Sequence, residues 1–580
     1  MTSMQGFFSL ALLAAIAAPG CYAGPADIAE LPDEGLTAGD SAASGESSGD
    51  DPSGGDPSGD DSGGCEGDDC EPPAGACADG VIKVGPSPLR RLTSAEFNRT
   101  VRDLFADPEL PWIDFSVADS KDGTRFDTNA EIPDPTIVED TIAAAETIAA
   151  AALAPEGAFV AGLDCDLADT ACVEPALRDL AGRAFRRPLA ADEGAELVAL
   201  YEGARDEWGG AQALEVAVTA VLASPRFLYL LEGGEPVPEN TERPGLLRLT
   251  DHEVASRLSY FLWQTMPDDA LFAAAEAGLL TTRAGVEDQA RRMIADDRFA
   301  AAVSRFHEQW LELDHRLADE TYKDPELYPE WSPALAQAMR KETKAFANSV
   351  IRGGDGKLST LLGASYSTID GALAELYGVD APAESFDVVE LDPGERAGIL
   401  SLSGFLAAHA HADEGSWVHR GLFVRTEVLC GSIPPPPPDV DMSVLNNPDR
   451  TVDPACAGCH VLMDPIGWGM DNYDAIGRFN LLDEDGGLAH GTVEGPEHLD
   501  VVGDFAGLTD LSGRLAESED VQACMARQWF RYATRRLEDT QADRCTIDRL
   551  AAGFVESEGD IRELLVEIAV SDGFRYIAAE

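Results

Sequence analysis

The spacing of apolar residues predicts a chain that is helical over most of its length. The segment 93–105 shows this clearly, because a capping-box sequence, Thr93-Ser94-Ala95-Glu96, precedes apolar residues three and four positions apart. We therefore expect a helix to begin here, and another to be capped by Asp251. Further helices are expected near residues 136–153, 174–187, 191–207, 211–225, 268–278, 284–296, 298–313, 332–352, 502–516, 518–537, 546–557 and 560–571.

Two stretches depart from this helical periodicity. The run from Phe386 to Leu391 is the best candidate for a strand. After Gly394 the residues Gly, Pro and His become frequent, and the prolines at 434–438 favour a stiff polyproline segment. Loops rich in Gly and Pro are suited to wrapping round a flat cofactor. The expected fold class is mainly α, a multi-domain helical body with one loop-rich segment.

The first 21 residues resemble an export signal. The apolar run from Phe7 to Ala18 is too short to span a bilayer. Small residues before Cys21 resemble a bacterial lipoprotein cleavage box, in which the cysteine thiol is lipidated. Two features depart from that pattern, since no Lys or Arg precedes the apolar run and the box starts with Ala18-Pro19. We expect export, lipidation of Cys21, and localisation at the outer membrane or cell surface, with the periplasm as second choice.

The composition of residues 22–80 predicts a disordered acidic tether, because it is dominated by Asp, Gly, Ser, Pro, Ala and Glu and contains no Lys or Arg. The whole chain has 105 acidic and 42 basic residues, which gives a net charge of −63. Such a charge repels phosphate backbones and anionic lipid headgroups. It excludes nucleic-acid partners and leaves the lipid anchor as the expected membrane contact.

The strongest chemical signal is the pentapeptide Cys456-Ala457-Gly458-Cys459-His460, which reads C-x-x-C-H. Two thiols at this spacing can add to the two vinyl groups of one porphyrin, and the adjacent imidazole can then bind the iron. Random placement of the Cys and His residues would give roughly 0.003 occurrences of the motif. One covalent haem c is therefore the favoured interpretation. The alternatives are a Cys456–Cys459 disulfide, a zinc half-site, or a site that has lost its cofactor.

His460 is the expected proximal ligand of such a haem, because its imidazole nitrogen suits iron. For the sixth position we favour His411 or His409, which lie upstream and could reach the distal face. Met470 or Met442 is the second choice, and an open or water-bound iron is the third. Each candidate also has a plain structural reading, as a surface histidine or as a methionine that fills a gap in packing.

The other cysteines are expected to form disulfides, because these persist outside the cytoplasm. Cys165 and Cys172 are close enough in sequence to bridge locally, and Cys524 with Cys545 is a plausible second pair. The remaining cysteines, which have no assignable partner from sequence, are Cys65, Cys70, Cys77 and Cys430.

Five further sequence features stand in order along the chain. They are LRRLTSAEFNRTVRDL at 89–104, AGRAFRRPL at 181–189, LSYFLWQTMPD at 258–268, the segment 409–467 with C-x-x-C-H and MDPIG, and QWFRYA at 528–533. Together they are similar to a planctomycete-type family of large exported bacterial proteins, which are built from five consecutive regions and described as of unknown function. One departure is that Ser416-Trp417 stands where the family usually has Ser-Pro.

The resemblance implies a mainly helical exported protein with one covalent haem in a cytochrome-c-like region. It implies no activity, because the family has none established. The expected organisation is a signal peptide with a lipoprotein Cys at 1–21, a linker at 22–80, helical regions at 81–160, 161–240 and 241–385, the cytochrome-c-like haem region at 386–495, and a C-terminal helical region at 496–580.

Two classes of function follow. The leading hypothesis is electron transfer or a haem-dependent oxidoreductase step at the cell envelope, with an unidentified redox partner or small-molecule substrate. The alternative is a cell-surface structural or carbohydrate-associated binding protein, in which C-x-x-C-H only staples the fold. The aromatic residues of the third and fifth motifs are expected in the core. The arginines of the first two motifs are expected to form ion pairs between helices, or to bind haem propionates: Arg90, Arg91, Arg183, Arg186 and Arg187.

Overall fold

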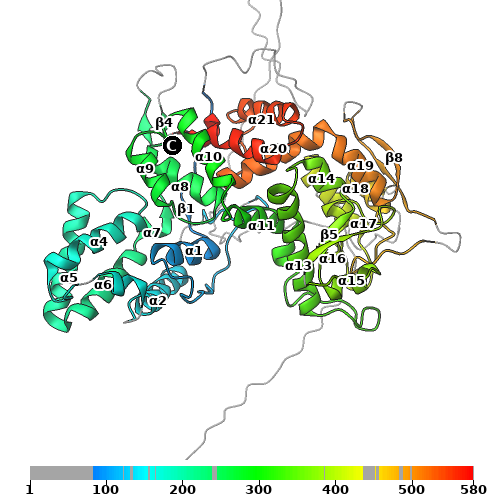
Figure 1. Ribbon diagram of the computed structural model, residues 1–580. Helices are drawn as coiled ribbons and strands as arrows, with labels where there is room; N and C mark the ends of the chain where they lie inside the picture. Colours follow the sequence, from blue (N-terminus) through cyan, green and yellow to red (C-terminus); the bar gives the residue numbers. More distant parts are fainter. Residues whose placement is uncertain are drawn as a thin grey trace, which may run out of the picture. The chain divides into compact units, whose positions relative to one another are not determined.

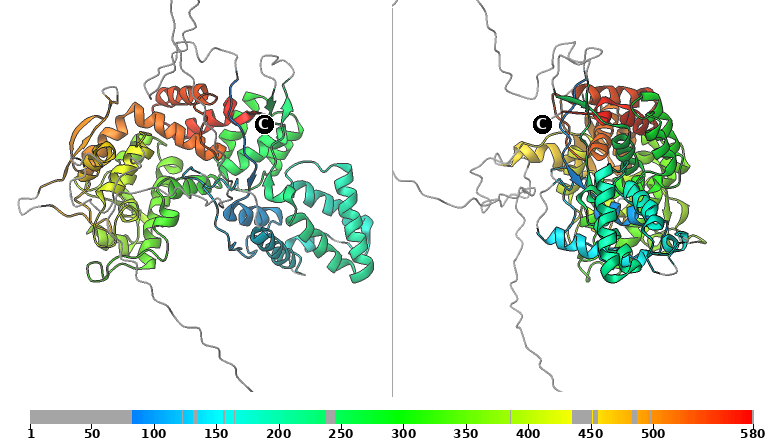
Figure 2. Two further views of the ribbon diagram at one scale, coloured as in Figure 1. Left: turned by 180° about the vertical axis from the view of Figure 1, so that it is seen from behind. Right: turned by 90° about the vertical axis from the view of Figure 1, so that its left-hand side faces the viewer.

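The computed structural model of the chain describes residues 82–121, 123–130, 135–154, 157–163, 165–237, 245–384, 386–434, 451, 456–482, 487–496 and 499–578. The predicted signal peptide and tether, Cys21 and Met442 lie outside these residues. Within them the fold is mainly helical, as predicted, and the strands are short (Figure 1 and Figure 2). No helix in this part of the chain is long and apolar enough to cross a membrane.

The N-terminal helices share one apolar core. The predicted capping box is confirmed, because the Thr93 hydroxyl accepts from the Glu96 amide and the Glu96 carboxylate accepts from the Thr93 amide. Phe97 and Val101 then bury one face of the first helix against its neighbours. The helices of this part are α1 (Ser94–Leu104), α2 (Pro135–Ala152), α3 (Ala158–Gly162), α4 (Thr170–Ala184), α5 (Ala191–Trp208), α6 (Gly210–Leu222) and α7 (Pro225–Leu228).

A second and larger core is built mainly from α8 (Asp251–Leu262) and the elements that follow it. The predicted cap at Asp251 is wrong by one residue, because Thr250 forms the capping box with Glu253. Asp251 instead accepts hydrogen bonds from the amides of Leu280 and Thr281. The following helices are α9 (Asp269–Glu276), α10 (Arg283–Ile294), α11 (Phe299–Trp310), α12 (Leu313–Arg316), α13 (Pro333–Asn348), the π-helical turn η1 (Ser349–Gly353), α14 (Leu358–Gly363) and α15 (Gly371–Tyr377).

The C-terminal third completes this second core. Phe306 of α11 stacks on Trp529, with 3.6 Å between ring centroids, so residues more than 200 positions apart meet at its centre. The aromatic residues of the third and fifth motifs are buried, as predicted. The elements are the 3₁₀ turn η2 (Ile399–Ser401), α16 (Ser403–Ala408), α17 (Trp417–Phe423), the π-helical turn η3 (Val424–Val428), α18 (Ala457–Trp468), α19 (Gly507–Glu517), α20 (Glu519–Thr534), α21 (Arg544–Glu556), α22 (Ile561–Val570) and α23 (Asp572–Arg575).

The strands of the described residues pair only in small antiparallel sheets. The predicted strand after Phe386 is confirmed, and its residues Asp387–Glu390 pair with Tyr366–Ile369. The helix predicted near 502–516 begins late, at Gly507, because residues 503–506 form a strand. The strands are β1 (Arg90–Arg91), β2 (Tyr229–Leu230), β3 (Glu235–Pro236), β4 (Leu246–Arg248), β5 (Tyr366–Ile369), β6 (Asp387–Glu390), β7 (His490–Val493), β8 (Gly503–Ala506) and β9 (Tyr576–Ala578).

A buried carboxyl group lies in the second core. Glu342 of α13 is fully buried and accepts hydrogen bonds from the hydroxyls of Ser367 and Tyr377, each at 2.8 Å, and of Ser403 at 3.2 Å. Burial raises the pKa of Glu342 from its ordinary 4.5 to about 7. The hydroxyls hold the carboxyl group in the core, and it keeps its proton at a pH where an exposed glutamate is ionised.

This carboxyl group predicts a pH-dependent stability. Between pH 4.5 and 7 the unfolded chain loses the Glu342 proton while the folded protein keeps it. The contribution of Glu342 to the free energy of unfolding is therefore fully present below pH 4.5. It is lost as the pH rises to 7, which lowers the free energy of unfolding by about 3 kcal/mol. Glu342→Gln should remove this fall. Urea unfolding at pH 5 and pH 8 measures it, with Glu375→Gln on the exposed side of α15 as the control. An unchanged pH profile in Glu342→Gln would contradict the assignment.

Candidate functional site

The C-x-x-C-H segment opens a helix instead of the predicted loop. Cys456 directly precedes α18, and Cys459 and His460 lie in its first turn. Residues at positions i, i+3 and i+4 share one helix face. The two thiols and the imidazole therefore point from the same side of one short element, which is the arrangement that bonding to a single porphyrin requires.

The two cysteines of the motif carry thiols. The structure therefore does not contain the Cys456–Cys459 disulfide considered as an alternative. Cys456 is buried, and the half-buried Cys459 donates from its sulfur to the Pro434 carbonyl oxygen at 3.1 Å. That contact brings the start of the polyproline run against the first turn of α18.

A carboxylate orients the histidine of the motif. The His460 side chain is only 3% exposed, and its Nδ1 lies 2.9 Å and 3.0 Å from the two carboxylate oxygens of Asp464, one helical turn further on. Donation from Nδ1 to a carboxylate fixes the tautomer and leaves the lone pair on Nε2. The sequence analysis did not identify Asp464 as a site residue. Its i, i+4 spacing from His460 would have indicated it if a helix had been expected here.

Two glycines allow α18 to pack closely on α17. A Cβ atom at Gly467 would overlap the Trp417 carbonyl oxygen, and one at Gly421 would overlap that of Met463. The two helix backbones are thus in direct contact at both glycines. The same closeness recurs beyond the helix, where a Cβ atom at Gly469 would overlap the Phe505 ring. This glycine-lined packing fixes the position of His460 relative to the preceding helix.

A buried arginine ties the segment after α18 to the rest of this region. Arg420 of α17 is 1% exposed and donates to the carbonyl oxygens of Met470, Tyr473, Leu406 and Asp474 at 2.7–3.1 Å. Burial lowers the pKa of Arg420 to about 10, so the group stays charged at neutral pH. The adjacent residues Arg420 and Gly421 therefore have two structural roles, since Arg420 binds carbonyl groups and Gly421 permits close packing.

The candidates for the sixth iron ligand differ in their surroundings. His409 is buried between the rings of Phe405 and Phe423, and its Nε2 lies 3.2 Å from the Leu311 carbonyl oxygen. His411 is exposed, and its ring centroid lies 5.3 Å from that of His419. Met470 is fully buried in the apolar core. Of these side chains, His411 is the one that the surrounding residues leave accessible.

No group of three or more His, Cys, Asp or Glu side chains with metal-binding geometry occurs in the described part of the chain. The zinc half-site considered from the sequence therefore has no completing ligands among these residues.

The disulfides correct one expectation. The predicted Cys165–Cys172 bridge is confirmed. The predicted Cys524–Cys545 pair is wrong, because Cys524 bonds to Cys430, 94 residues upstream. Cys545 is also disulfide-bonded. Sequence proximity favoured the wrong pair, whereas the fold brings Cys430, just after η3, against α20.

The motif arginines form contacts within the protein, as the ion-pair interpretation predicted. Arg90 binds Glu96 at 2.8 Å. Arg186 differs, because it donates to four backbone carbonyl groups instead of a carboxylate. The remaining pairs are Arg91 with Asp119, Arg183 with Asp269, and Arg187 with Glu193.

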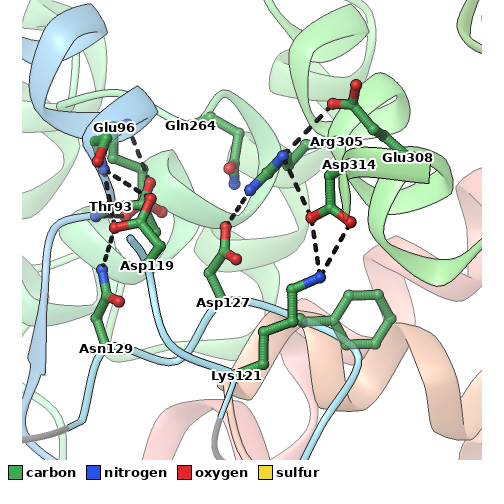
Figure 3. Close-up of polar contacts among 12 residues, drawn as sticks. Thr93, Glu96, Asp119, Lys121, Asp127, Asn129, Gln264, Arg305, Glu308 and Asp314 are labelled. Carbon is green, nitrogen blue, oxygen red and sulfur yellow. Dashed lines mark hydrogen bonds and ion pairs between the residues drawn. The ribbon is translucent and has the colours of Figure 1, made fainter. Parts of the chain in front are cut away.

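A cluster of charges links the segment after α1 to α11 and α12, and we refer to it as the Arg305 cluster. Figure 3 shows Arg305 between Asp127, Glu308 and Asp314, with Lys121 on the far side of Asp314. The Lys121 ammonium lies 2.9 Å from Asp314. The hydrogen bond with His315 and the positive charges of Lys121 and Arg305 hold the pKa of Asp314 well below its usual range. In the described residues, Arg305 is the only cation that binds the Asp127 carboxylate.

Five family models match the chain, and each is described as a protein of unknown function. Together they cover more than half of the chain, so the chain belongs to the multi-domain family built from these five regions, and the resemblance seen in the motifs is confirmed. The matches are DUF1587 over 90–154, DUF1595 over 172–232, DUF1592 over 249–379, DUF1588 over 396–483 and DUF1585 over 503–574. No curated protein and no solved structure matches the chain.

Proposed function

We propose that this protein is an exported c-type cytochrome-like protein that carries one haem c on α18. The observation that carries the proposal is the start of that helix, where two thiols and a histidine share one face and Asp464 fixes the histidine tautomer. The donor set fits the group, because thiols form the thioether links and a neutral imidazole binds iron through Nε2. The role is electron transfer or a haem-dependent redox step.

Each residue of the site has its own role in holding such a group. Cys456 and Cys459 anchor it at two points one helical turn apart. His460 presents Nε2, and Asp464 holds the proton on Nδ1 and so keeps the ring in one orientation. When bound, the haem supplies a one-electron iron couple whose potential depends on the axial ligands and on burial.

The accessibility of His411 supports it as the sixth ligand. Its ring is exposed and lies beside His419 in the segment that leads into α17, the helix that packs on α18. His409 would first have to break its contact with Leu311 and leave its place between two phenylalanine rings. Export and lipidation at Cys21 belong to the same proposal, because c-type haem is attached outside the cytoplasm.

The alternative function is a cell-surface structural or binding protein. Its support is that the helices around α18 are held by glycine contacts, by Arg420 and by a disulfide, none of which needs a cofactor. In that case the C-x-x-C-H thiols would stay unmodified in the mature protein.

Expression with a working cytochrome c maturation system separates these two functions. We expect a coloured protein whose haem survives acid–acetone extraction, and a peptide containing residues 456–460 with the mass of one added haem. Cys456→Ser with Cys459→Ser should abolish the covalent haem.

Asp464→Asn should keep the covalent haem but shift its reduction potential to more positive values, because a weaker Nδ1 hydrogen bond makes the imidazole less basic.

The controls for this experiment lie close to the site. Asp471→Asn, an exposed carboxylate just beyond α18, should leave the potential unchanged. Loss of the low-spin spectrum in His411→Ala would identify the sixth ligand. Unmodified peptide from wild-type protein, made beside a control cytochrome that does mature, would reject the haem and leave the structural alternative.

A further inference from the structure

A cavity of about 320 Å³ lies beside the N-terminal core, remote in sequence from the C-x-x-C-H helix. Arg99, Arg102 and Asp103 of α1 line one side, and Arg298 lines another. Trp263, directly after α8, completes this set. Three arginines and one aspartate therefore line the cavity, in a chain whose net charge is −63.

Two of the three arginines have their own partners. Arg102 donates through Nε and Nη2 to the Leu110 carbonyl oxygen, at 3.1 Å and 2.7 Å. Arg298 binds Asp296 and Asp268, and its guanidinium lies 3.4 Å from the centroid of the Trp263 ring. These contacts account for the position of both side chains without a ligand.

Arg99 lacks such a partner. Its Nη1 is buried and has no hydrogen-bond acceptor, and no carboxylate in the described residues forms an ion pair with Arg99. The lining carboxylate, Asp103, accepts a hydrogen bond from the Thr265 hydroxyl at 2.6 Å. Burial and the positive charge of Arg305 both lower the pKa of Arg99, so the environment opposes its charge. A buried guanidinium with an unmade hydrogen bond is costly unless something else supplies the acceptor.

We propose that this cavity binds a small oxyanion, a molecule with a carboxylate or phosphate group that accepts hydrogen bonds from the Arg99 guanidinium. Guanidinium groups match the planar pair of oxygens on such anions. At roughly 30 Å³ for each water-sized group, the volume admits a ligand of about ten non-hydrogen atoms. The site is independent of the haem proposal, because none of its residues belongs to the C-x-x-C-H region.

Because Arg99 and Asp103 carry opposite charges, replacing each with a neutral residue should have opposite effects on anion binding. Arg99→Met should weaken anion binding at least about tenfold, because it removes a charge-assisted hydrogen bond. Asp103→Asn should strengthen it about fivefold, because it removes a negative charge from the lining. Without an anion, Arg99→Met should melt at the same temperature as the wild type or higher, since the unpaired guanidinium is gone.

The test is isothermal titration of the full chain with inorganic phosphate and with acetate, at constant ionic strength set by chloride. Phosphate binding with no acetate binding would identify a phosphate-type ligand, and the reverse a carboxylate. The control is Arg283→Met, because the Arg283 side chain is 55% exposed and pairs with Glu567. This variant should bind as the wild type does.

Three results would overturn the proposal. One is the absence of saturable binding of either anion to the wild type. Another is wild-type affinity in Arg99→Met. If Arg99→Met does not fold, Asp103→Asn still decides, because unchanged or weaker binding in that variant contradicts an anion in this cavity.

Discussion

Gly467→Ala is expected to lower the free energy of unfolding by about 3 kcal/mol. The added methyl group would overlap the backbone oxygen of Trp417, and a backbone atom cannot move aside as a flexible side chain can. The crossing of α17 and α18 must therefore open. Because His460 lies on α18, the same change should reduce the yield of haem-loaded protein.

A matched control lies in the same helix. Nothing surrounds a Cβ atom at Gly458 within 4 Å, so Gly458→Ala should be neutral or stabilising by up to about 1 kcal/mol. Chemical unfolding followed by circular dichroism compares the two variants. Equal stability of Gly467→Ala and wild type would mean that the two helices are not in backbone contact.

Arg305→Met is expected to have an effect of similar size, about 3 kcal/mol of lost stability. The Asp127 side chain is 3% exposed, and its only cationic partner among the described residues would be gone. Glu308 and Asp314 keep other cations, Arg340 and Lys121, so the loss is concentrated at Asp127. An unpaired buried carboxylate is costlier than the lost pair is favourable.

A double-mutant cycle tests this explanation. Arg305→Met combined with Asp127→Asn should recover much of the stability, because no buried charge then lacks a partner. Arg283→Gln removes an exposed ion pair and should change stability by less than about 1 kcal/mol. If the double variant is as unstable as the sum of the single variants, the two side chains act independently.

The helices could be predicted from sequence, because most follow the apolar period and begin at recognisable caps. Thr93 and Glu96 form the capping box that their spacing indicates. Asp251 is also a common capping residue, but Thr250, one residue earlier, forms the capping box with Glu253. What the sequence could not supply were contacts between distant segments. The stacking of Phe306 on Trp529 and the bond from Cys430 to Cys524 depend on how the helices pack.

The sequence names the residues of the candidate site, whereas the helix that holds them is found only in the structure. The frequent Gly and Pro residues around C-x-x-C-H indicated a loop, yet α18 is a helix, and its Gly467 permits close packing instead of a turn. Residues i and i+4 lie on one face only in a helix, so a predicted loop gave no reason to pair His460 with Asp464. The missing acceptor of Arg99 Nη1 could not be predicted from the sequence either, because only the fold shows which arginines of a motif are paired.

The Cys430–Cys524 bond has a topological consequence for the segment it encloses. It closes a covalent ring of the chain, and the whole C-x-x-C-H helix lies inside that ring. A single proteolytic cut within the ring leaves both fragments joined. Shedding the helix, with anything bonded to it, requires a second cut or a reductant.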